Sequence, residues 1–410
     1  MNQKKKKNIK TKGTINSTIF DDIEYTQQLL SILAIWPLVS KSSTIKKIIS
    51  VIHLLVIIGS LIWNILFRCI FIYIYVKKFD DQIMLIGPTF FRVIILLKYL
   101  AIIYHRRTIK KIIEHIQTDW NNVECQEQQN IMMKNVQINR QVTLVFAFLM
   151  YVSGAFYNFV MPHIIPLLTH RGSRNATQRL TIFPGYNVLF DVQKSPIYEI
   201  TFFFHIFSVF AGFSVLICAC NLAIVLVTHA CGQIQIIISQ LNSLIDNFMK
   251  DENTVFIEFA SLIRRHVRVI KFSNNIIKDA LYEICLVEIG ASSILICIVE
   301  FLFLKMIENK NYANMVPYAM LLASLVASIL ILCYFSELLD NQFIEAGMQA
   351  YLINWNQLPP KARTYLISII IISQRSYKIT AGGIIDLSYV AFVQILKTGF
   401  AYLQLLRATM

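Results

Sequence analysis

The stretch Ala381–Met410 reads AGGIIDLSYVAFVQILKTGFAYLQLLRATM and is apolar over most of its length. We expect it to form the last membrane-spanning helix, with no cytosolic tail after it. At about 100° per residue, five of its positions fall on one narrow face, which is small or polar except for one leucine. That face holds Gln394, Thr398, Ala401, Leu405 and Thr409. Such a stripe suits either a helix that lines a narrow aqueous path or one that packs closely against another helix.

Composition places the rest of the chain in a membrane as well. Hydrophobic residues make up 56% of the 410, charged residues make up 15%, and the mean hydropathy is +0.57, too apolar for an ordinary soluble protein. The net charge of +14 does not indicate a nucleic-acid partner, because the basic residues flank long apolar runs and therefore reflect topology. The eight cysteines show neither zinc-ligand nor disulfide spacing, so we expect no metal site and no cofactor.

Long apolar runs predict an all-α integral membrane protein with seven spanning helices. Six runs precede the closing stretch: Ile48–Val76, Gln82–Tyr104, Val142–Leu168, Ile200–Val227, Leu281–Leu304 and Val316–Leu339. The apolar stretch Leu29–Val39 is too short to span, and we expect an interfacial or buried helix that ends near Pro37. Between residues 340 and 380, the apolar spacing around Pro359 and Pro360 predicts two helices outside the membrane, the second leading into the last span.

The distribution of Lys and Arg predicts the orientation. If the N-terminus is cytosolic, 25 of the 38 basic residues lie in inner segments and nine in outer ones, which is the asymmetry expected of a cytosolic N-terminus. Seven spans then make the C-terminus extracellular. The expected regions are a cytosolic N-terminus with its short helix (1–47), spans one to six (48–339), a cytosolic anchor region (340–380) and the last helix (381–410). The sequon at Asn175 would face outward as a glycosylation site.

A candidate ligand pocket lies in the outer halves of spans two to five. Aromatic walls with a few hydroxyl groups suit a small, volatile and mostly apolar ligand. The same residue types are also ordinary packing material in membrane bundles, so this pattern leaves both interpretations open. The candidates are Phe90, Phe91, Tyr151, Gly154, Tyr157, His205, Ser208 and Gly212.

Ionisable residues inside the spans are costly in lipid and should face a partner or water. One compatible pairing joins Arg92 of span two to Glu300 of span five. No span collects the paired carboxylates or His clusters that catalysis within a membrane requires, so we do not expect an enzyme. The residues concerned are Arg92, Lys98, Glu288, Glu300, Asp386 and Lys397.

Two other classes of seven-span or multi-span protein fit less well. A G-protein-coupled receptor requires the opposite orientation, and the sequence has neither an acid-Arg-aromatic triplet after span three nor an Asn-Pro pair in span seven. We therefore expect no G-protein partner. A transporter would be expected to show paired inverted repeats with broken helices, and no such repeat is visible.

A set of short motifs, most of them in the closing third, carries a resemblance to a known family. They are Ile35-Trp36-Pro37, Tyr334-Phe335-Ser336-Glu337, Ala350-Tyr351, Trp355, Pro359, Ser373-Gln374-Arg375-Ser376, Thr380-Ala381-Gly382-Gly383 and the closing FVQILKTGFAYLQLLR. In these residues and in span layout, the chain resembles the insect odorant receptors. The resemblance is strongest in the last eighty residues, whereas the first 330 match mainly in layout and length.

This resemblance implies an odour-tuned subunit of a ligand-gated, non-selective cation channel in the plasma membrane of a sensory neuron dendrite. Such subunits form a hetero-tetramer with an obligate co-receptor, and their last helices line the pore. Alignment with the co-receptor's last helix would place its hydrophobic gate at Leu405 and Thr409. Tyr351 and Trp355 would anchor subunits to one another. The co-receptor's long loop insertion between spans four and five is missing, which favours a tuning subunit.

A gustatory receptor of the same superfamily is the nearer alternative. Its final helix usually carries a Thr-Tyr-hydrophobic-hydrophobic-hydrophobic-Gln-Phe-like signature. The segment Ala401-Tyr402-Leu403-Gln404-Leu405 departs from that pattern.

Overall fold

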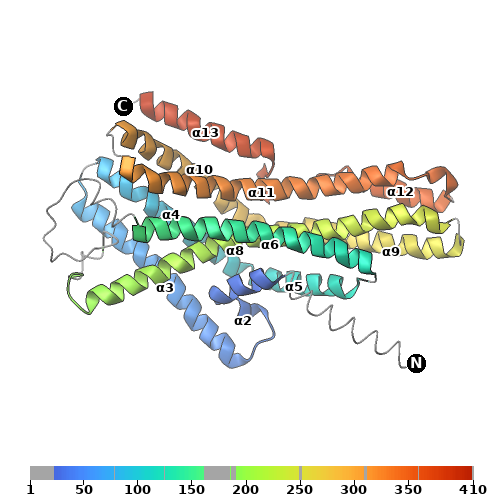
Figure 1. Cartoon of the computed structure of the whole chain (residues 1–410), viewed down its shortest axis with the longest axis horizontal. Coiled ribbons are helices and arrows are strands. Elements are labelled where there is room, and N and C mark those ends of the chain that lie inside the picture. The colour runs from blue at the N-terminus through green and yellow to red at the C-terminus, as the bar shows by residue number, and fades with distance from the viewer. Residues whose placement is uncertain are drawn as a thin grey trace.

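The structure is a computed structural model that describes residues 23–77, 79–123, 125–160, 185, 191–248, 252–308, 312–358 and 360–408. It is an elongated bundle whose helices run mostly along one axis (Figure 1). Within the described residues, six helical segments are long and apolar enough to cross a membrane, so the predicted all-helical membrane class is confirmed. They belong to α3 (Thr44–Tyr75), α4 (Phe79–Tyr104), α6 (Gln126–Ala155), α8 (Ile197–Phe248), α10 (Lys278–Glu308) and α11 (Tyr312–Leu352).

Several of these helices are far longer than a bilayer is thick. The 52 residues of α8 correspond to about 78 Å at 1.5 Å per residue, against roughly 30 Å of hydrocarbon. The helices therefore continue out of the membrane and form a second bundle, in which they pack with shorter elements. These are α2 (Trp36–Val39), α5 (Arg106–Asn121), α9 (Glu252–Lys271), η3 (Phe272–Ile277), η4 (Trp355–Gln357) and α12 (Pro360–Ser373). The short helix η1 (Phe156–Val160) instead continues α6 within the membrane bundle.

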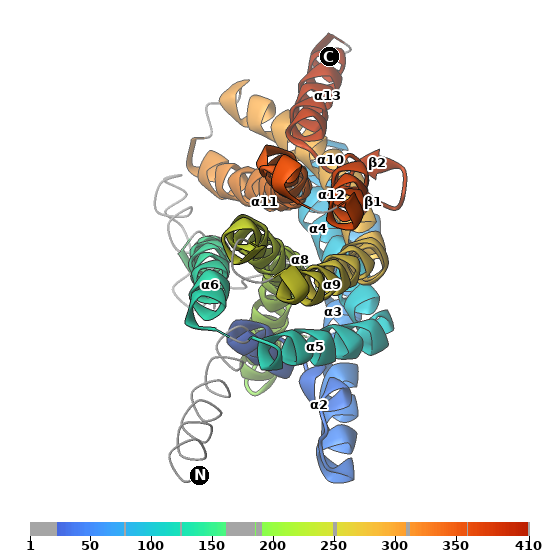
Figure 2. The same cartoon turned by 90° about the vertical axis from the view of Figure 1, so that its right-hand side faces the viewer.

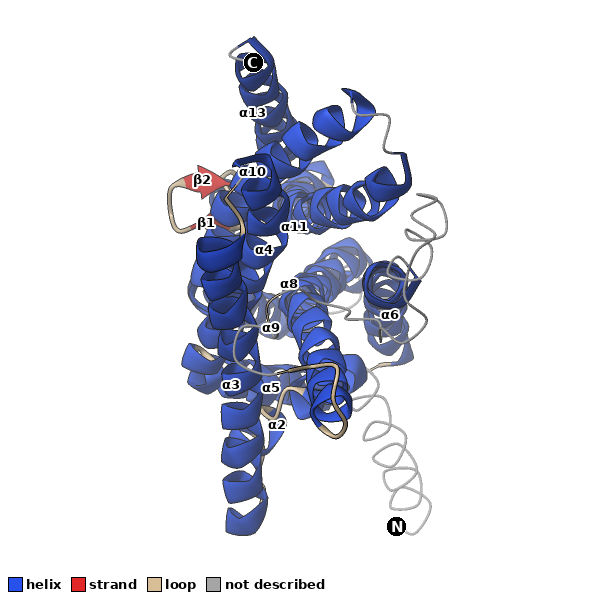
Figure 3. Ribbon diagram, turned by 90° about the vertical axis from the view of Figure 1, so that its left-hand side faces the viewer, coloured by secondary structure: helices blue, strands red, loops and turns tan. Residues whose placement is uncertain are grey.

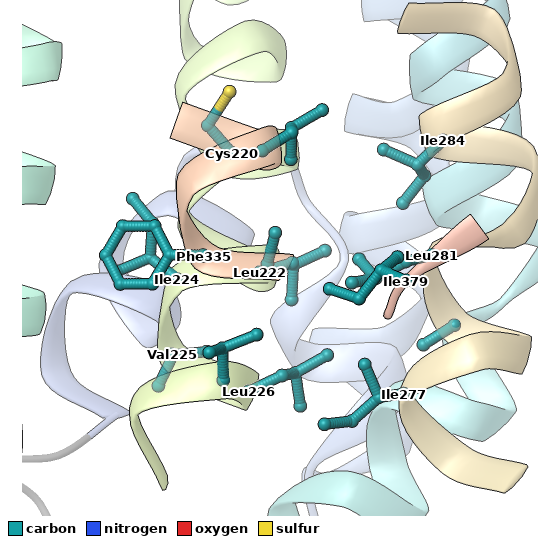
Figure 4. Packing of buried hydrophobic residues seen from close by; sticks show 14 of the residues in the cluster. Cys220, Leu222, Ile224, Val225, Leu226, Ile277, Leu281, Ile284, Phe335 and Ile379 are labelled. Carbon is teal, nitrogen blue, oxygen red and sulfur yellow. The ribbon is translucent and has the colours of Figure 1, made fainter. Parts of the chain in front are cut away.

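Helix α8 is the centre of the bundle, with α6 and α11 packed along it and α4 and α9 beside it. It is buried on every side between Ser214 and Ile234, as expected of a helix that is apolar all round. Figure 4 shows Leu222, Ile224 and Leu226 of α8 among side chains from other elements, including Phe335 of α11 and Leu281 of α10. Because α8 contacts nearly every layer, its side chains set the spacing of the other helices.

The short N-terminal helix is buried, and its end differs from the expectation. Helix continues from residue 23 to 32, Ala34 takes a left-handed conformation with φ 61°, and Pro37 then lies in the first turn of α2. Pro37 therefore begins a helix where we predicted an end, because proline is tolerated in a first helical turn. Thr26 donates a 2.7 Å hydrogen bond to Asn221 of α8, so one face of this segment is bound into the core.

The closing stretch is helical over only part of its length. Strands β1 (Thr380–Ala381) and β2 (Ile385–Asp386) pair as an antiparallel hairpin (Figure 3), and α13 (Tyr389–Ala408) follows. The expected helix from residue 381 is therefore wrong over its first eight positions. Gly382 and Gly383 make the turn at φ 58° and 68°, a conformation that side chains other than glycine rarely adopt. The count of seven spanning helices remains a prediction, because α13 is not one of the six.

The segment between α12 and β1 is fastened to α11. Ser336 accepts a hydrogen bond from the backbone N–H of Ile379 at 2.8 Å, and Asp340 accepts one from that of Tyr377 at 2.7 Å. The ring of Tyr377 stacks on Phe343 with centroids 3.7 Å apart. Helix α11 itself continues without a break through the expected boundary at residues 339 and 340. The anchor region is thus an extension of the sixth span, which then turns back through α12.

Buried charges inside the bundle pair differently from the expectation. Lys98 of α4 forms an ion pair with Glu288 of α10, and both side chains are 2% exposed. The second carboxylate oxygen of Glu288 accepts a 3.2 Å hydrogen bond from Ser292. Glu300 instead lies against Gly399 of α13, and Arg92 donates to the carbonyl of Ser208 at 3.4 Å. The expected pairing of Arg92 with Glu300 is therefore wrong, because the two face different helices.

A second buried acid holds together the end of the bundle that carries α5, α9 and α12. Asp119 of α5 contacts His115 at 3.2 Å and His229 of α8 at 3.1 Å, and Arg268 of α9 at 2.5 Å. Burial alone would raise the pKa of Asp119, but the hydrogen bonds from His115 and His229 outweigh it and hold the pKa well below its ordinary value. This carboxylate therefore joins three helices outside the predicted spans.

Replacing only one member of the intramembrane pair should destabilise the fold. In Lys98→Met or Glu288→Leu, one charge stays buried without its partner, which costs roughly 3–5 kcal/mol of unfolding free energy. The double variant Lys98→Met/Glu288→Leu buries no orphaned charge and should unfold nearer the wild-type temperature. Thermal unfolding of the detergent-solubilised protein measures both effects. If the single and double variants lose the same amount of unfolding temperature, the interaction between Lys98 and Glu288 does not stabilise the fold.

Asp119→Asn should also destabilise the protein, by about 2 kcal/mol, since it removes charge-assisted hydrogen bonds. The folded pKa of Asp119 is depressed, so its contribution is complete above the unfolded value of about 4 and disappears as the pH falls through the folded value. The difference in unfolding temperature between wild type and Asp119→Asn should therefore narrow below about pH 4. A difference that stays constant between pH 7 and 3 would contradict the assignment.

Candidate functional site

A cavity lies inside the membrane bundle, between α3, α4, the junction of α6 with η1, α8 and α11. Its volume is about 60 Å³. It lies toward the end of the bundle where α3 ends and α11 begins (Figure 1). Whether this end is the outer one stays a prediction. The lining residues are Arg68, Pro88, Phe91, Arg92, Ile95, Ser153, Tyr157, Asn158, Phe213, Tyr318, Met320, Leu321 and Ser324.

A hydrogen bond between α4 and α11, made possible by Pro88 of α4, helps to close the cavity on the α11 side. Pro88 lies inside α4 and has no N–H, so the carbonyl of Met84 loses its helical donor. The hydroxyl of Tyr318 on α11 donates to that carbonyl at 3.3 Å. The aromatic ring of Tyr318 is thereby held against α4, and it forms part of the cavity wall.

The predicted pocket residues are distributed within and around this cavity. Phe91 and Tyr157 line it directly. Gly154 lies against the ring of Phe213, a lining residue, and Gly212 lies beside Ile95 and Arg92. Glycine at these two positions lets α6 and α4 approach α8 closely, and a larger side chain would take up the space of the cavity wall.

Ser208 and His205 belong to a polar network at the same level. Asn64 of α3 donates to the hydroxyl of Ser208 at 2.8 Å. The ring of His205 is hydrogen-bonded to the side-chain oxygen of Asn158 at 3.2 Å. The predicted residues Ser208 and His205 therefore hold the cavity wall in place, since Asn158 lines the cavity itself.

The remaining two predicted residues, Tyr151 and Phe90, also lie outside the lining. Tyr151 shares a 2.8 Å hydrogen bond with Ser214 and stacks on Phe210 with centroids 5.5 Å apart. Phe90 is partly buried against the hydrophobic core. Both perform packing within the bundle, which is the alternative that the residue types left open.

Several lining residues were not identified from the sequence. Arg68 is the most informative, because an arginine inside an apolar run is a recognisable signal of a polar site. No comparable feature of the sequence marks the lining residues that α11 contributes, which are Tyr318, Leu321 and Ser324. These side chains are ordinary for a membrane helix, and only the packing of α11 against α4 brings them to the cavity.

The stripe on α13 is exposed where the structure describes it. Gln394, Thr398 and Ala401 are exposed, and Gly399 on the opposite face contacts Glu300 and Ile296 of α10. In the view along the bundle, α13 lies at the edge beside α10 and α11 (Figure 2). The side chain of Leu405 and the whole of Thr409 lie outside the described residues, as does Asn175.

Comparison with known proteins identifies the family. Residues 78–400 match the family described as 7tm Odorant receptor, and the chain belongs to it. It is 25% identical over 218 residues to Odorant receptor 10 of Aedes albopictus, covering 53% of this chain and 57% of that protein. It is 24% identical over 197 residues to Odorant receptor 13a of Drosophila melanogaster, covering 44% and 46%. The matched part thus spans about half the length of these relatives.

The fold also resembles a solved structure of that kind. The insect olfactory receptor OR5 from Machilis hrabei in complex with eugenol superposes with a TM-score of 0.71 at 14% identity, over 95% of this chain and 100% of that one. Membership of a ligand-binding receptor family confirms that the chain is not an enzyme.

Gly154→Ala should destabilise the cavity wall. The added Cβ would lie 2.4 Å from the ring of Phe213, and the resulting overpacking costs about 1–3 kcal/mol of unfolding free energy. Gly290→Ala in α10 is a matched control, because its Cβ would meet nothing within 4 Å and alanine is the better helix former. The unfolding temperature should therefore fall in Gly154→Ala and should not fall in Gly290→Ala. Equal stability of the two variants would contradict the close packing.

Proposed function

We propose that the protein is an odour-tuned subunit of a ligand-gated, non-selective cation channel, and that it binds a small volatile molecule in the cavity. The observation that carries this proposal is a largely apolar cavity whose wall includes α4, a helix joined through α10 to an exposed polar stripe on α13. Family membership supports the receptor function. Eugenol bound to the similar olfactory receptor OR5 supports a small-molecule ligand.

The pore in this proposal is lined by α13. Its polar face, with Gln394 and Thr398, is exposed in the single chain, while Gly399 faces the bundle. Exposed polar residues on a membrane helix are costly against lipid and suit a water-filled path. Four such helices around a common axis, this one and those of its partners, would form the channel. Leu405 and Thr409 would form a hydrophobic constriction, which conducts once it becomes hydrated.

In this proposal, contacts between α4, α10 and α13 couple the cavity to the pore. Arg92 and Ile95 of α4 line the cavity, and Lys98, on the same helix, forms its ion pair with α10. Helix α10 in turn packs against α13, where Glu300 and Gly399 meet. A ligand that moves α4 would therefore shift α10 and the pore helix, provided that it binds the two states with different affinity.

The partner in this proposal is the odorant co-receptor in a hetero-tetramer. Tyr351 and Trp355 are 67% and 47% exposed, and they line an apolar groove with Leu366 and Ile370 of α12. Exposed aromatic residues beside an apolar groove are typical anchors of a protein interface. The chain would lie in the plasma membrane with seven spans, a cytosolic N-terminus and Asn175 outside.

Co-expression with an odorant co-receptor, followed by recording of odour-evoked currents, tests the function. We expect cation currents that require both subunits and reverse near 0 mV, because the pore does not select among monovalent cations. Cells with the co-receptor alone are the control. An odour response that needs a G protein and no co-receptor would contradict the proposal.

Leu405→Ala should weaken the constriction of the pore. A smaller apolar ring is hydrated more easily, so resting leak should rise and less ligand should be needed for activation. Leu403→Ala is the control, because two positions along a helix turn a side chain by about 200°. If Leu405→Ala leaves both leak and activation unchanged, the gate lies elsewhere.

A further inference from the structure

A second hollow, an open cleft, lies where α4 turns into α5, against the first turns of α10. Its volume is about 560 Å³, which is within the roughly 300–1,000 Å³ of small-molecule sites. It shares no lining residue with the cavity inside the membrane bundle, so the two are separate sites. The residues that line the cleft are Tyr104, His105, Arg106, Arg107, Thr108, Asp279, Tyr282 and Glu283.

The cleft lies at one edge of the surface that faces lipid. On the approach to it, α4 exposes Leu97 and Leu100, and α10 exposes Leu286. Exposed apolar residues on spanning helices contact acyl chains. Tyr104 and Tyr282 come next and are also exposed, and tyrosine is typical of the level where hydrocarbon gives way to lipid head groups. The charged residues of the cleft follow directly in both helices, so they lie at the depth of the head groups.

The two walls of the cleft carry opposite charges. Arg106 and Arg107 are exposed at the start of α5. Asp279 and Glu283 lie four residues apart, on one face of α10. Glu283 is hydrogen-bonded to the ring of His105, which is buried. Among the described residues, Arg107 and Asp279 form no ion pair, so a guanidinium and a carboxylate line the cleft without compensating each other.

The hairpin that precedes α13 holds the α10 wall in place. The backbone N–H of Gly382 donates to the carbonyl of Tyr282 at 3.3 Å, and a Cβ on Gly383 would lie 3.5 Å from the ring of Tyr282. Figure 3 shows the hairpin beside α10. The position of this aromatic wall is therefore fixed by the fold, and a molecule in the cleft would lie beside the segment that leads into α13.

A phospholipid head group can supply both charges at this depth. Its phosphate matches the planar donors of a guanidinium, and the ammonium of a zwitterionic lipid matches carboxylates and the faces of aromatic rings. A lipid with net negative charge fits less well, because the carboxylates of α10 would lie opposite its negative group. Opposite charges on the two walls thus favour a head group that carries both signs.

We propose that the cleft binds the head group of a zwitterionic phospholipid from the surrounding membrane. Arg106 and Arg107 contact the phosphate, and Asp279 contacts the ammonium. Tyr104 and Tyr282 form the sides of the site, and the acyl chains lie along the exposed apolar residues of α4 and α10. This inference concerns a site other than the cavity and does not depend on the proposed channel function.

Binding is measured on the purified full-length chain in detergent. The probes are dioleoyl phosphatidylethanolamine, dioleoyl phosphatidylglycerol and dioleoylglycerol, which share their acyl chains and differ in the head group. The readout is the lipid concentration that gives half of the maximal rise in unfolding temperature. We expect phosphatidylethanolamine to act at a concentration roughly tenfold or more below that of dioleoylglycerol, which has neither phosphate nor ammonium.

Variants separate the two charges of the head group. Arg107→Gln should weaken both phospholipids by roughly tenfold, because both carry the phosphate. Asp279→Asn should weaken phosphatidylethanolamine by roughly three- to tenfold and should not weaken phosphatidylglycerol, which has no ammonium. Lys47→Gln is the matched control, since it removes an exposed positive charge from the start of α3, outside the cleft. The unfolding temperature without lipid shows that each variant is folded.

Four outcomes would overturn the inference. The first is an equal response to dioleoylglycerol and phosphatidylethanolamine. The second is an Arg107→Gln variant that binds phosphatidylethanolamine as Lys47→Gln does. The third is a loss in Asp279→Asn that is the same for both phospholipids. The fourth is glycerophosphoethanolamine, which has no acyl chains, acting at the same concentration as the whole lipid, because the site would then belong to a soluble phosphate compound.

Discussion

The ion pair between Lys98 and Glu288 connects the two parts of this structure that the proposed function needs. It joins α4, which carries the cavity wall, to α10, which carries α13. In a bilayer, neither charge can be left without compensation, so the register of α4 on α10 is restricted to the one in which the two side chains meet. The ion pair therefore restricts how the cavity lies relative to α13, the pore helix of the proposed channel.

A small number of buried polar contacts also orients the other helices of the bundle. Asn221 of α8 accepts from Thr26 and donates to Thr143 of α6 at 3.0 Å, so one amide orients three segments. Tyr318 satisfies the carbonyl that Pro88 leaves free in α4. Apolar surface drives these helices together with little directional preference, whereas such buried polar groups specify which faces meet. Tyr318 and Pro88 also line the cavity, so one of these polar contacts forms part of its wall.

One long helix, α11, contributes both to the cavity and to the exposed apolar groove beside Tyr351. Helix α11 supplies Tyr318 and Ser324 to the cavity near one end and Tyr351 to an exposed apolar groove at the other. A helix of 41 residues is stiff over this distance, so the two sites move as one body unless the helix bends. In the proposed channel, contacts between subunits at the groove would hold α11 still, and α4 and α10 would carry the motion toward α13.

The sequence alone determined the membrane class, six of the spans and the family resemblance, because hydropathy and helical period are local properties of a chain. Of the side chains that line the cavity, it identified Phe91 and Tyr157 as pocket residues. It also indicated that Lys98 and Glu288 would need partners. It did not reveal which charges pair, since Arg92 and Glu300 have the right types and depths yet face different helices. Nor did it show the hairpin before α13 or the part that α11 plays in the cavity. These features depend on how helices rotate against one another, which is set by packing between residues far apart in the sequence, and only the tertiary structure decides it.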